Sequence, residues 1–102
     1  MSTVATKITF KLSGLFGKSG RYYEFRTPLE LVVETEEHGA WVHRLAELDI
    51  WTVEPARDDS LLALMDMLDA EYETYGNSAL KFRHPAATRG HKRFHKIVKH
   101  VY

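Results

Sequence analysis

The chain of 102 residues contains no cysteine, which excludes disulfides, thiolate metal sites and a cysteine nucleophile. A chain without cysteine suits a reducing compartment, and we expect the cytoplasm. The first ten residues lack the apolar segment of a signal peptide, and no apolar run approaches the roughly 20 residues that cross a bilayer. We therefore expect no association with a membrane.

Acidic residues are missing from the end of the chain. Residues 81–102 carry seven lysines and arginines and no acid, residues 28–80 carry two against thirteen acids, and residues 1–27 carry five against one. The formal net charge is zero because these blocks cancel. Each block still produces its own local field. The pattern indicates either charged partners or pairing of the blocks inside one fold.

Length and a hydrophobic fraction of 44% predict one globular α+β domain over residues 1–102. Its first half has the alternation and turn residues of strands, with a glycine-rich loop over residues 13–20 and either a sheet edge or a break at Pro28. Strands are expected at residues 6–12, 21–26, 29–36, 41–45 and 50–53. Together they predict an antiparallel β-meander of four to five strands within residues 5–54.

The period changes to that of a helix over residues 58–75. Its apolar face comprises Leu61, Leu64, Met65, Leu68, Tyr72 and Tyr75. A separate stripe holds the acids Asp59, Asp66, Asp69 and Glu73. We expect this acidic amphipathic helix to cover one face of the sheet. The stripe is then either solvated or a docking surface for a basic partner.

A last short strand is expected at residues 80–84, followed by a basic helix over residues 88–102. One helical face carries Phe94, Ile97, Val98 and Val101. The candidate nucleic-acid contacts are Arg89, Lys92, Arg93, Lys96 and Lys99. These cations could neutralise phosphates while one of the interleaved aromatic side chains, Phe82, Phe94 or Tyr102, stacks on an unpaired base. Alternatively, the apolar face docks on the domain and the charges are solvated or pair with the acidic helix.

Three motifs for other chemistry are incomplete. The segment Gly17-Lys18-Ser19 resembles the end of a phosphate-binding loop, but Leu12 occupies the position of its first glycine. His91 and His95 have a spacing that suits one metal ion, with His84 or His100 as a further ligand, yet two cations lie between them. The same histidines would suit a ribonuclease. We predict no catalytic residue, metal or cofactor.

Three short motifs carry a family resemblance. Residues 36–42 combine a turn with a glycine-aromatic strand, residues 46–48 (Ala-Glu-Leu) stand where a Pro-Glu-Leu is common, and residues 59–61 (Asp-Ser-Leu) stand where a helix begins. In this order they resemble the HicB-like antitoxin domain, over residues 31–75. The resemblance implies a non-catalytic protein that binds and neutralises a small basic RNA-cleaving toxin. It also implies a homodimer or a higher homo-oligomer.

Overall fold

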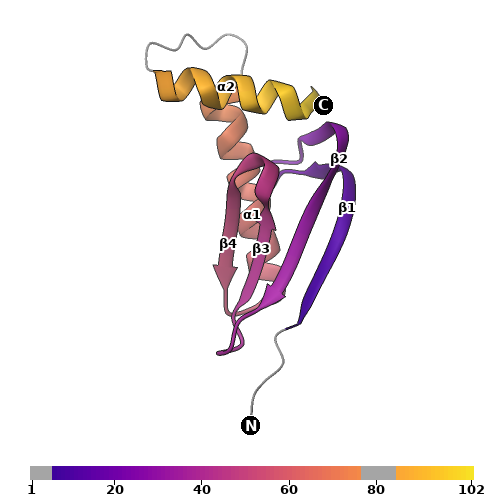
Figure 1. Ribbon diagram of the computed structural model, residues 1–102, viewed down its shortest axis with the longest axis vertical. Helices are drawn as coiled ribbons and strands as arrows, with labels where there is room; N and C mark the ends of the chain where they lie inside the picture. The colour runs from indigo at the N-terminus through magenta and orange to yellow at the C-terminus, as the bar shows by residue number, and fades with distance from the viewer. Residues whose placement is uncertain (1–5, 77–84) are drawn as a thin grey trace.

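One antiparallel sheet and two helices form the part of the chain that the computed structural model describes, residues 6–76 and 85–102 (Figure 1). The elements are β1 (Lys7–Phe16), β2 (Tyr22–Thr35), β3 (Trp41–Leu45), the 3-10 helix η1 (Ala46–Leu48), β4 (Ile50–Glu54), α1 (Arg57–Glu71), the π-helical turn η2 (Tyr72–Gly76), α2 (Pro85–Ile97) and β5 (Val98–Val101). The predicted α+β class, with an antiparallel sheet of four to five strands, is confirmed.

The sheet has the order β1-β2-β3-β4, and β5 also pairs with β2. The long strand β2 therefore has three neighbours: β1 along one edge, and β3 and β5 at different places along the other. Because side chains alternate along a strand, the sheet has a face toward α1 and an outer face. The register places these residues on the face toward α1: Ile8, Phe10, Leu31, Val33, Trp41, His43, Leu45, Ile50 and Thr52.

The strand pair β1–β2 is longer and more continuous than the sequence predicts. The loop expected at residues 13–20 is shorter in the structure, because β1 extends to Phe16. Of the two alternatives at Pro28, an edge or a break, the break is absent, because β2 continues through this residue. The register jumps from Leu12 paired with Leu29 to Gly14 paired with Glu24, so Pro28 lies in a bulge of β2 without a partner on β1. Proline lacks an N–H donor, and at such a bulge no ladder hydrogen bond is lost.

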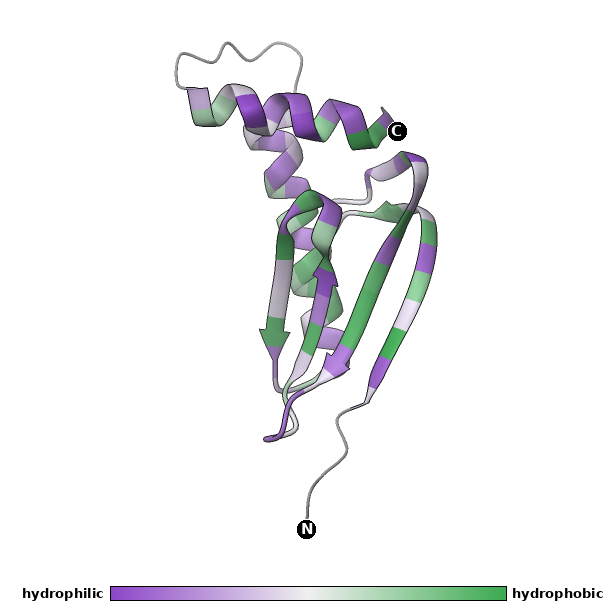
Figure 2. Cartoon of the chain, in the orientation of Figure 1, coloured by the Kyte–Doolittle hydropathy of each residue, from purple (hydrophilic) through white to green (hydrophobic). Residues whose placement is uncertain are grey.

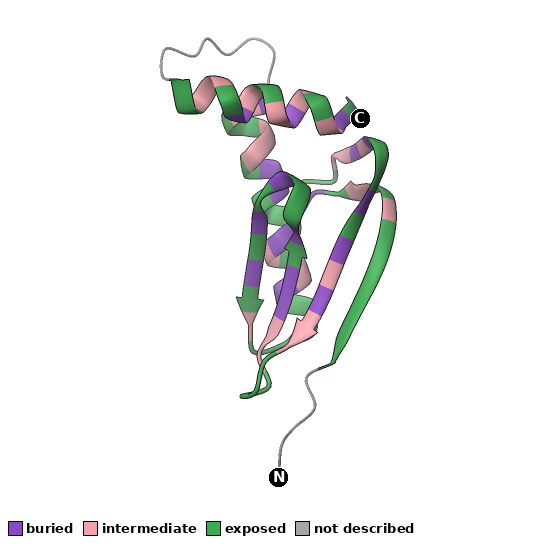
Figure 3. Ribbon diagram, viewed as in Figure 1, coloured by how far each residue is buried: buried purple, intermediate pink, exposed green. Residues whose placement is uncertain are grey.

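Helix α1 packs its apolar face on the sheet, as the period predicts. Leu64 and Leu68 are fully buried and belong to the same hydrophobic core as residues of β2, β3 and β4. Leu61, Met65 and the two tyrosines of that face are half-buried. Figure 3 shows the contrast between the buried positions of β2 and β3 and the largely exposed strand β1. Helix α1 thus covers the middle of the sheet and leaves β1 at its margin.

The end of the chain differs from the predicted helix over residues 88–102. Helix α2 runs from Pro85 to Ile97, and the chain then continues as strand β5, in which Val98 and Val101 pair with Phe25 and Tyr23 of β2. β-branched residues favour a strand once a sheet edge is available. The strand expected at residues 80–84 lies outside the described residues.

Helix α2 is mostly hydrophilic (Figure 2) and crosses the end of the sheet near the β1–β2 loop (Figure 1). It docks through Phe94, which is buried, and Ile97, which is half-buried. Of the alternatives left open by the sequence, the structure shows the docking of this apolar face on the domain. In residues 6–76 and 85–102, no helix is long and apolar enough to cross a membrane.

Candidate functional site

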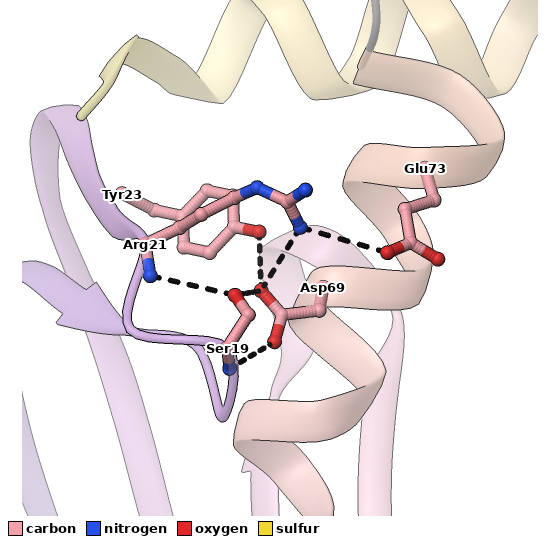
Figure 4. A network of polar contacts seen from close by, with 5 residues as sticks. All are labelled: Ser19, Arg21, Tyr23, Asp69 and Glu73. Atoms are coloured by element: carbon pink, nitrogen blue, oxygen red, sulfur yellow. Dashed lines mark hydrogen bonds and ion pairs between the residues drawn. The ribbon is translucent and has the colours of Figure 1, made fainter.

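Asp69, near the end of α1, holds the β1–β2 loop against the helix (Figure 4). Its carboxylate accepts hydrogen bonds from the Tyr23 hydroxyl at 2.6 Å, the Ser19 amide at 2.8 Å and the Ser19 hydroxyl at 2.9 Å. The Arg21 guanidinium lies 3.9 Å from this carboxylate and 3.5 Å from that of Glu73. The network joins the loop, β2 and α1.

The acidic stripe of α1 is therefore smaller than the sequence predicts. Placing Asp69 on a solvated stripe is wrong, because its side chain is only 8% exposed. Glu73 is exposed and pairs with Arg21. Asp59 and Asp66 are exposed, as expected. Of the four acids, Asp69 and Glu73 therefore belong to the network, and Asp59 and Asp66 lie outside it.

The protonation states in the network are fixed by burial and hydrogen bonding. Burial opposes ionisation of Asp69, but the hydrogen bonds from Tyr23 and Ser19 and the charge of Arg21 outweigh it, so the pKa of Asp69 is lowered. Burial and the neighbouring carboxylate raise the pKa of Tyr23 well above its usual value. The tyrosine thus remains a protonated donor to an ionised acid.

The lowered pKa of Asp69 predicts a loss of stability in acid. The ionised carboxylate stabilises the fold fully above its unfolded pKa of about 4, and this contribution disappears as pH falls through the lower folded pKa. Urea unfolding of the wild type from pH 7 to about pH 3 should show this loss. In Asp69→Asn the slope of unfolding free energy against pH should be shallower below about pH 4; an unchanged slope would contradict the assigned pKa shift.

In the glycine-rich loop that resembles a phosphate-binding loop, polar groups that could bind a phosphate instead bind the Asp69 carboxylate. The amide and hydroxyl of Ser19 already bind a carboxylate. A Cβ on Gly17 would overlap the same carboxylate, which explains the need for glycine there. The loop links two strands and packs against the end of α1, and it does not lead into the N-terminus of a helix as a phosphate-binding loop does. The Ser19 amide therefore stabilises the fold.

A second polar cluster is buried under the start of α1. His43 Nδ1 lies 2.8 Å from the Ser60 hydroxyl oxygen, and the Thr52 hydroxyl donates to the Ser60 carbonyl at 2.7 Å. Burial lowers the pKa of His43, and the charge of Arg57 lowers it further. His43 is therefore a neutral imidazole at pH 7 that ties β3 to α1.

The predicted cations of the C-terminal segment lie largely in solvent. The exposed ones are Arg89, Lys92, Lys96 and Lys99. Arg93 is half-buried and lies 4.0 Å from the carboxylate of Glu71. Lys99 belongs to β5 rather than to the helix. One cation thus pairs with α1, and four remain exposed.

Aromatic rings gather where β1, β2 and β5 lie side by side. The rings of Phe16 and Tyr22 are 4.8 Å apart, those of Tyr22 and Tyr102 are 6.2 Å apart, and those of His100 and Tyr102 are 4.5 Å apart. Tyr102 is 68% exposed and Phe16 is 56% exposed. The Tyr102 hydroxyl donates to the carboxylate of Glu24 at 3.4 Å. The rings therefore form an exposed platform.

Exposed cations lie on the elements that carry or neighbour this platform. Lys99 precedes His100 on β5, and Lys96 lies in the last turn of α2. The exposed Arg26 of β2 reaches the same helix end, because its Nε donates to the His95 carbonyl at 2.9 Å. We name this region the basic–aromatic surface, which comprises Phe16, Tyr22, Arg26, Lys96, Lys99, His100 and Tyr102.

The two histidines of α2 lie next to each other, and the described part of the chain supplies no third ligand for a metal ion beside them. The rings of His91 and His95 are 4.4 Å apart, and His91 Nδ1 lies 2.6 Å from the Tyr75 carbonyl oxygen. Burial and the neighbouring histidine lower the pKa of His95. Across residues 6–76 and 85–102, no three His, Asp or Glu side chains could hold a metal ion. His84 lies outside those ranges.

No family model, curated protein or solved structure matches this chain. The resemblance to the HicB-like antitoxins thus stays a prediction from the motifs in residues 31–75. What the chain binds is therefore inferred from the charged and apolar surfaces of its own structure.

Three members of the basic–aromatic surface, Phe16, Tyr22 and Arg26, are missing from the candidate residues that the sequence indicates. Phe16 and Tyr22 flank the glycine-rich loop, and their pairing follows from the hairpin register, which is a usable signal. Arg26 joins the surface only because β5 lies beside β2 and brings α2 with it. No local pattern indicates this contact.

Proposed function

We propose that this chain is a non-catalytic binding protein that holds single-stranded nucleic acid on the basic–aromatic surface. The observation that carries the proposal is the placement of exposed lysines and exposed aromatic rings on adjoining elements. Lysine and arginine neutralise backbone phosphates and release their counterions. Aromatic side chains stack on bases that are free of a partner strand. The two kinds of group together suit an unpaired strand better than a duplex.

The charges of α2 extend this surface. Arg89 and Lys92 are exposed on the same helix as Lys96, one turn or two turns earlier in the chain. A strand that stacks on Tyr102 could therefore place its phosphates along the helix. Three to five phosphate contacts are within reach of Arg26, Lys99 and the cations of α2.

Salt dependence tests the proposal. With a fluorescent single strand of about 12 nucleotides, the logarithm of the binding constant should fall linearly with the logarithm of salt concentration. Three to five contacts predict a slope between roughly −2 and −3.5. Duplex RNA of the same sequence should bind more weakly. A flat salt response, or a preference for duplex, would reject the proposal.

The same titration separates binding from catalysis. The strand should be recovered at full length after incubation with the protein. Shorter products that disappear in His91→Ala or His95→Ala would instead support a histidine-dependent ribonuclease.

A second candidate is the antitoxin-like function that the HicB resemblance implies. The observation that favours it is the exposed side of α1, where Asp59 and Asp66 lie with Leu62, which is 46% exposed, and Met67, which is 36% exposed. Such a mixture of acids and apolar groups suits a small basic protein, with the charges contributing to association rate and register. This candidate includes a homodimer or higher oligomer and a cytoplasmic location.

Charge reversal distinguishes the two candidates. Asp59→Lys combined with Asp66→Lys should weaken capture of a basic protein from lysate at low salt and should leave nucleic-acid binding intact or strengthen it. The control is the same pull-down with nuclease-treated lysate. If the double variant captures the same basic protein as the wild type does, α1 has no role in binding that protein.

A further inference from the structure

A pocket of about 330 Å³ lies between β1 and the start of α1, away from the basic–aromatic surface. Its walls are apolar, and its polar lining comes from β3 and the first turn of α1. The lining residues are Ile8, Phe10, Leu31, Val33, Trp41, His43, Arg57, Asp58 and Leu61. Ile8 and Phe10 are 46% and 48% exposed, although they lie on the face of the sheet toward α1. The pocket exists because α1 covers β2 to β4 and stops short of β1.

His43 gives the pocket a polar group that the fold does not use fully. The residue is only 3% exposed, and its Nδ1 is held by Ser60. In the described part of the chain, Nε2 has no hydrogen-bond partner, and it is not sealed from solvent. Since His43 lines the pocket, we infer that this nitrogen can be reached by a molecule inside it. A polar group left unpaired by a fold is a natural contact for a ligand.

The charges of the lining favour an uncharged ligand. Arg57 and Asp58 lie at the rim, with their side chains 3.7 Å apart as an ion pair of exposed groups. The Arg57 guanidinium also lies over the ring of Trp41, at 5.9 Å from its centre. The charges of Arg57 and Asp58 thus compensate each other, and the buried His43 is neutral. A neutral imidazole either donates or accepts a hydrogen bond at Nε2, depending on its tautomer.

From this geometry we propose that the pocket binds a small uncharged aromatic molecule of one or two rings with a single hydroxyl or N–H group, of the phenol or indole class. Its rings lie against Phe10, Trp41 and Leu61, and its polar group bonds to His43 Nε2. The volume is sufficient, since a dry cavity of roughly 150 Å³ accommodates benzene. The pocket also falls at the small end of the usual range for ligand sites, about 300–1,000 Å³.

Indole is the probe for the test, and naphthalene is its matched control without a donor. In a titration followed by side-chain and amide NMR, indole should give saturable shifts at Phe10, Trp41 and His43. Naphthalene should bind up to about tenfold more weakly, because it lacks the hydrogen bond. Equal affinity of the two probes would overturn the role of His43, and absence of saturable shifts with both would overturn the site.

Two variants of β1 locate the site without touching the core. Ile8→Trp places a large ring into the pocket from an exposed position and should abolish indole binding. Thr9→Trp puts the same ring on the outer face of the same strand and should leave indole binding unchanged. If Ile8→Trp binds indole as the wild type does, the probe lies elsewhere and the proposal fails. Because both changed positions are exposed, each variant should retain the wild-type amide spectrum outside β1.

Discussion

Replacing Asp69 with alanine should destabilise the protein by about 3 kcal/mol, whereas replacing Asp66 should change its stability by less than about 0.5 kcal/mol. Both residues lie on α1, three positions apart, and the sequence assigns them to the same acidic stripe. The structure separates them: Asp66 is exposed, and Asp69 is buried with three hydrogen bonds. Asp66→Ala is therefore the matched control.

The large effect follows from the groups that Asp69→Ala would leave behind. The Tyr23 hydroxyl is a buried donor, and Ser19 and Arg21 lose the acceptor that orders the β1–β2 loop. Hydrogen bonds to an ionised group contribute about 1.5–3 kcal/mol each and are not additive when they share one acceptor. Urea or thermal unfolding measures the result, with an expected fall in Tm of roughly 12–24 °C for a domain of this size. Similar small effects for the two alanine variants would contradict the network.

Reversing Lys96 and Lys99 to glutamate should weaken single-strand binding by about 150- to 900-fold. Each reversal exchanges an attraction of about 1 kcal/mol for a repulsion of similar size, and two reversals together approach 3–4 kcal/mol. The salt slope should also become shallower by about 1.4, as expected for two lost phosphate contacts on a single strand. Fluorescence anisotropy at about 0.1 M salt measures both quantities.

Lys7→Glu combined with Lys11→Glu is the control for this experiment. All four lysines are exposed, and each pair changes the net charge by the same amount. Lys7 and Lys11 lie on β1 where it pairs with the second half of β2, away from the part of β2 that pairs with β5. Binding that falls equally in both double variants would mean that net charge alone attracts the strand, and the basic–aromatic surface would lose its role.

Local periodicity accounts for the parts of the fold that the sequence predicts well. Alternation identifies β3 and β4, because one face of each of these strands is buried against α1. It also identifies β1, whose apolar side chains lie on the same face of the sheet although α1 does not cover them. The 3.6-residue period identifies α1 for the same reason, through Leu64 and Leu68. The period fails at Val98–Val101, where apolar residues three apart suit a helix as well as a strand. The pairing of that segment with Tyr23–Phe25, more than 70 positions earlier in the numbering, decides between them.

Of the candidate site, the sequence predicts only the basic character, which depends on amino-acid composition. The excess of lysine and arginine near the end of the chain indicates a basic surface, and four of the five predicted cations are exposed. The fate of Asp69 depends on Tyr23 and Ser19, which are 46 and 50 residues away in the chain. A helical wheel contains no information about such distant partners. The pocket beside His43 likewise follows from how far α1 extends over the sheet, which no local pattern determines.

The most direct test of the central claim is a backbone amide NMR titration of the wild type with a single-stranded RNA of about 12 nucleotides. If the strand binds the basic–aromatic surface, the shifted amides should cluster at Phe16, Tyr22, Arg26 and residues 92–102, and the amide signals of β4 and of the first turns of α1 should not shift. Shifts centred on Asp59 and Asp66 would contradict binding at the basic–aromatic surface. The absence of any shift at RNA concentrations well above those of the anisotropy titration would contradict it as well.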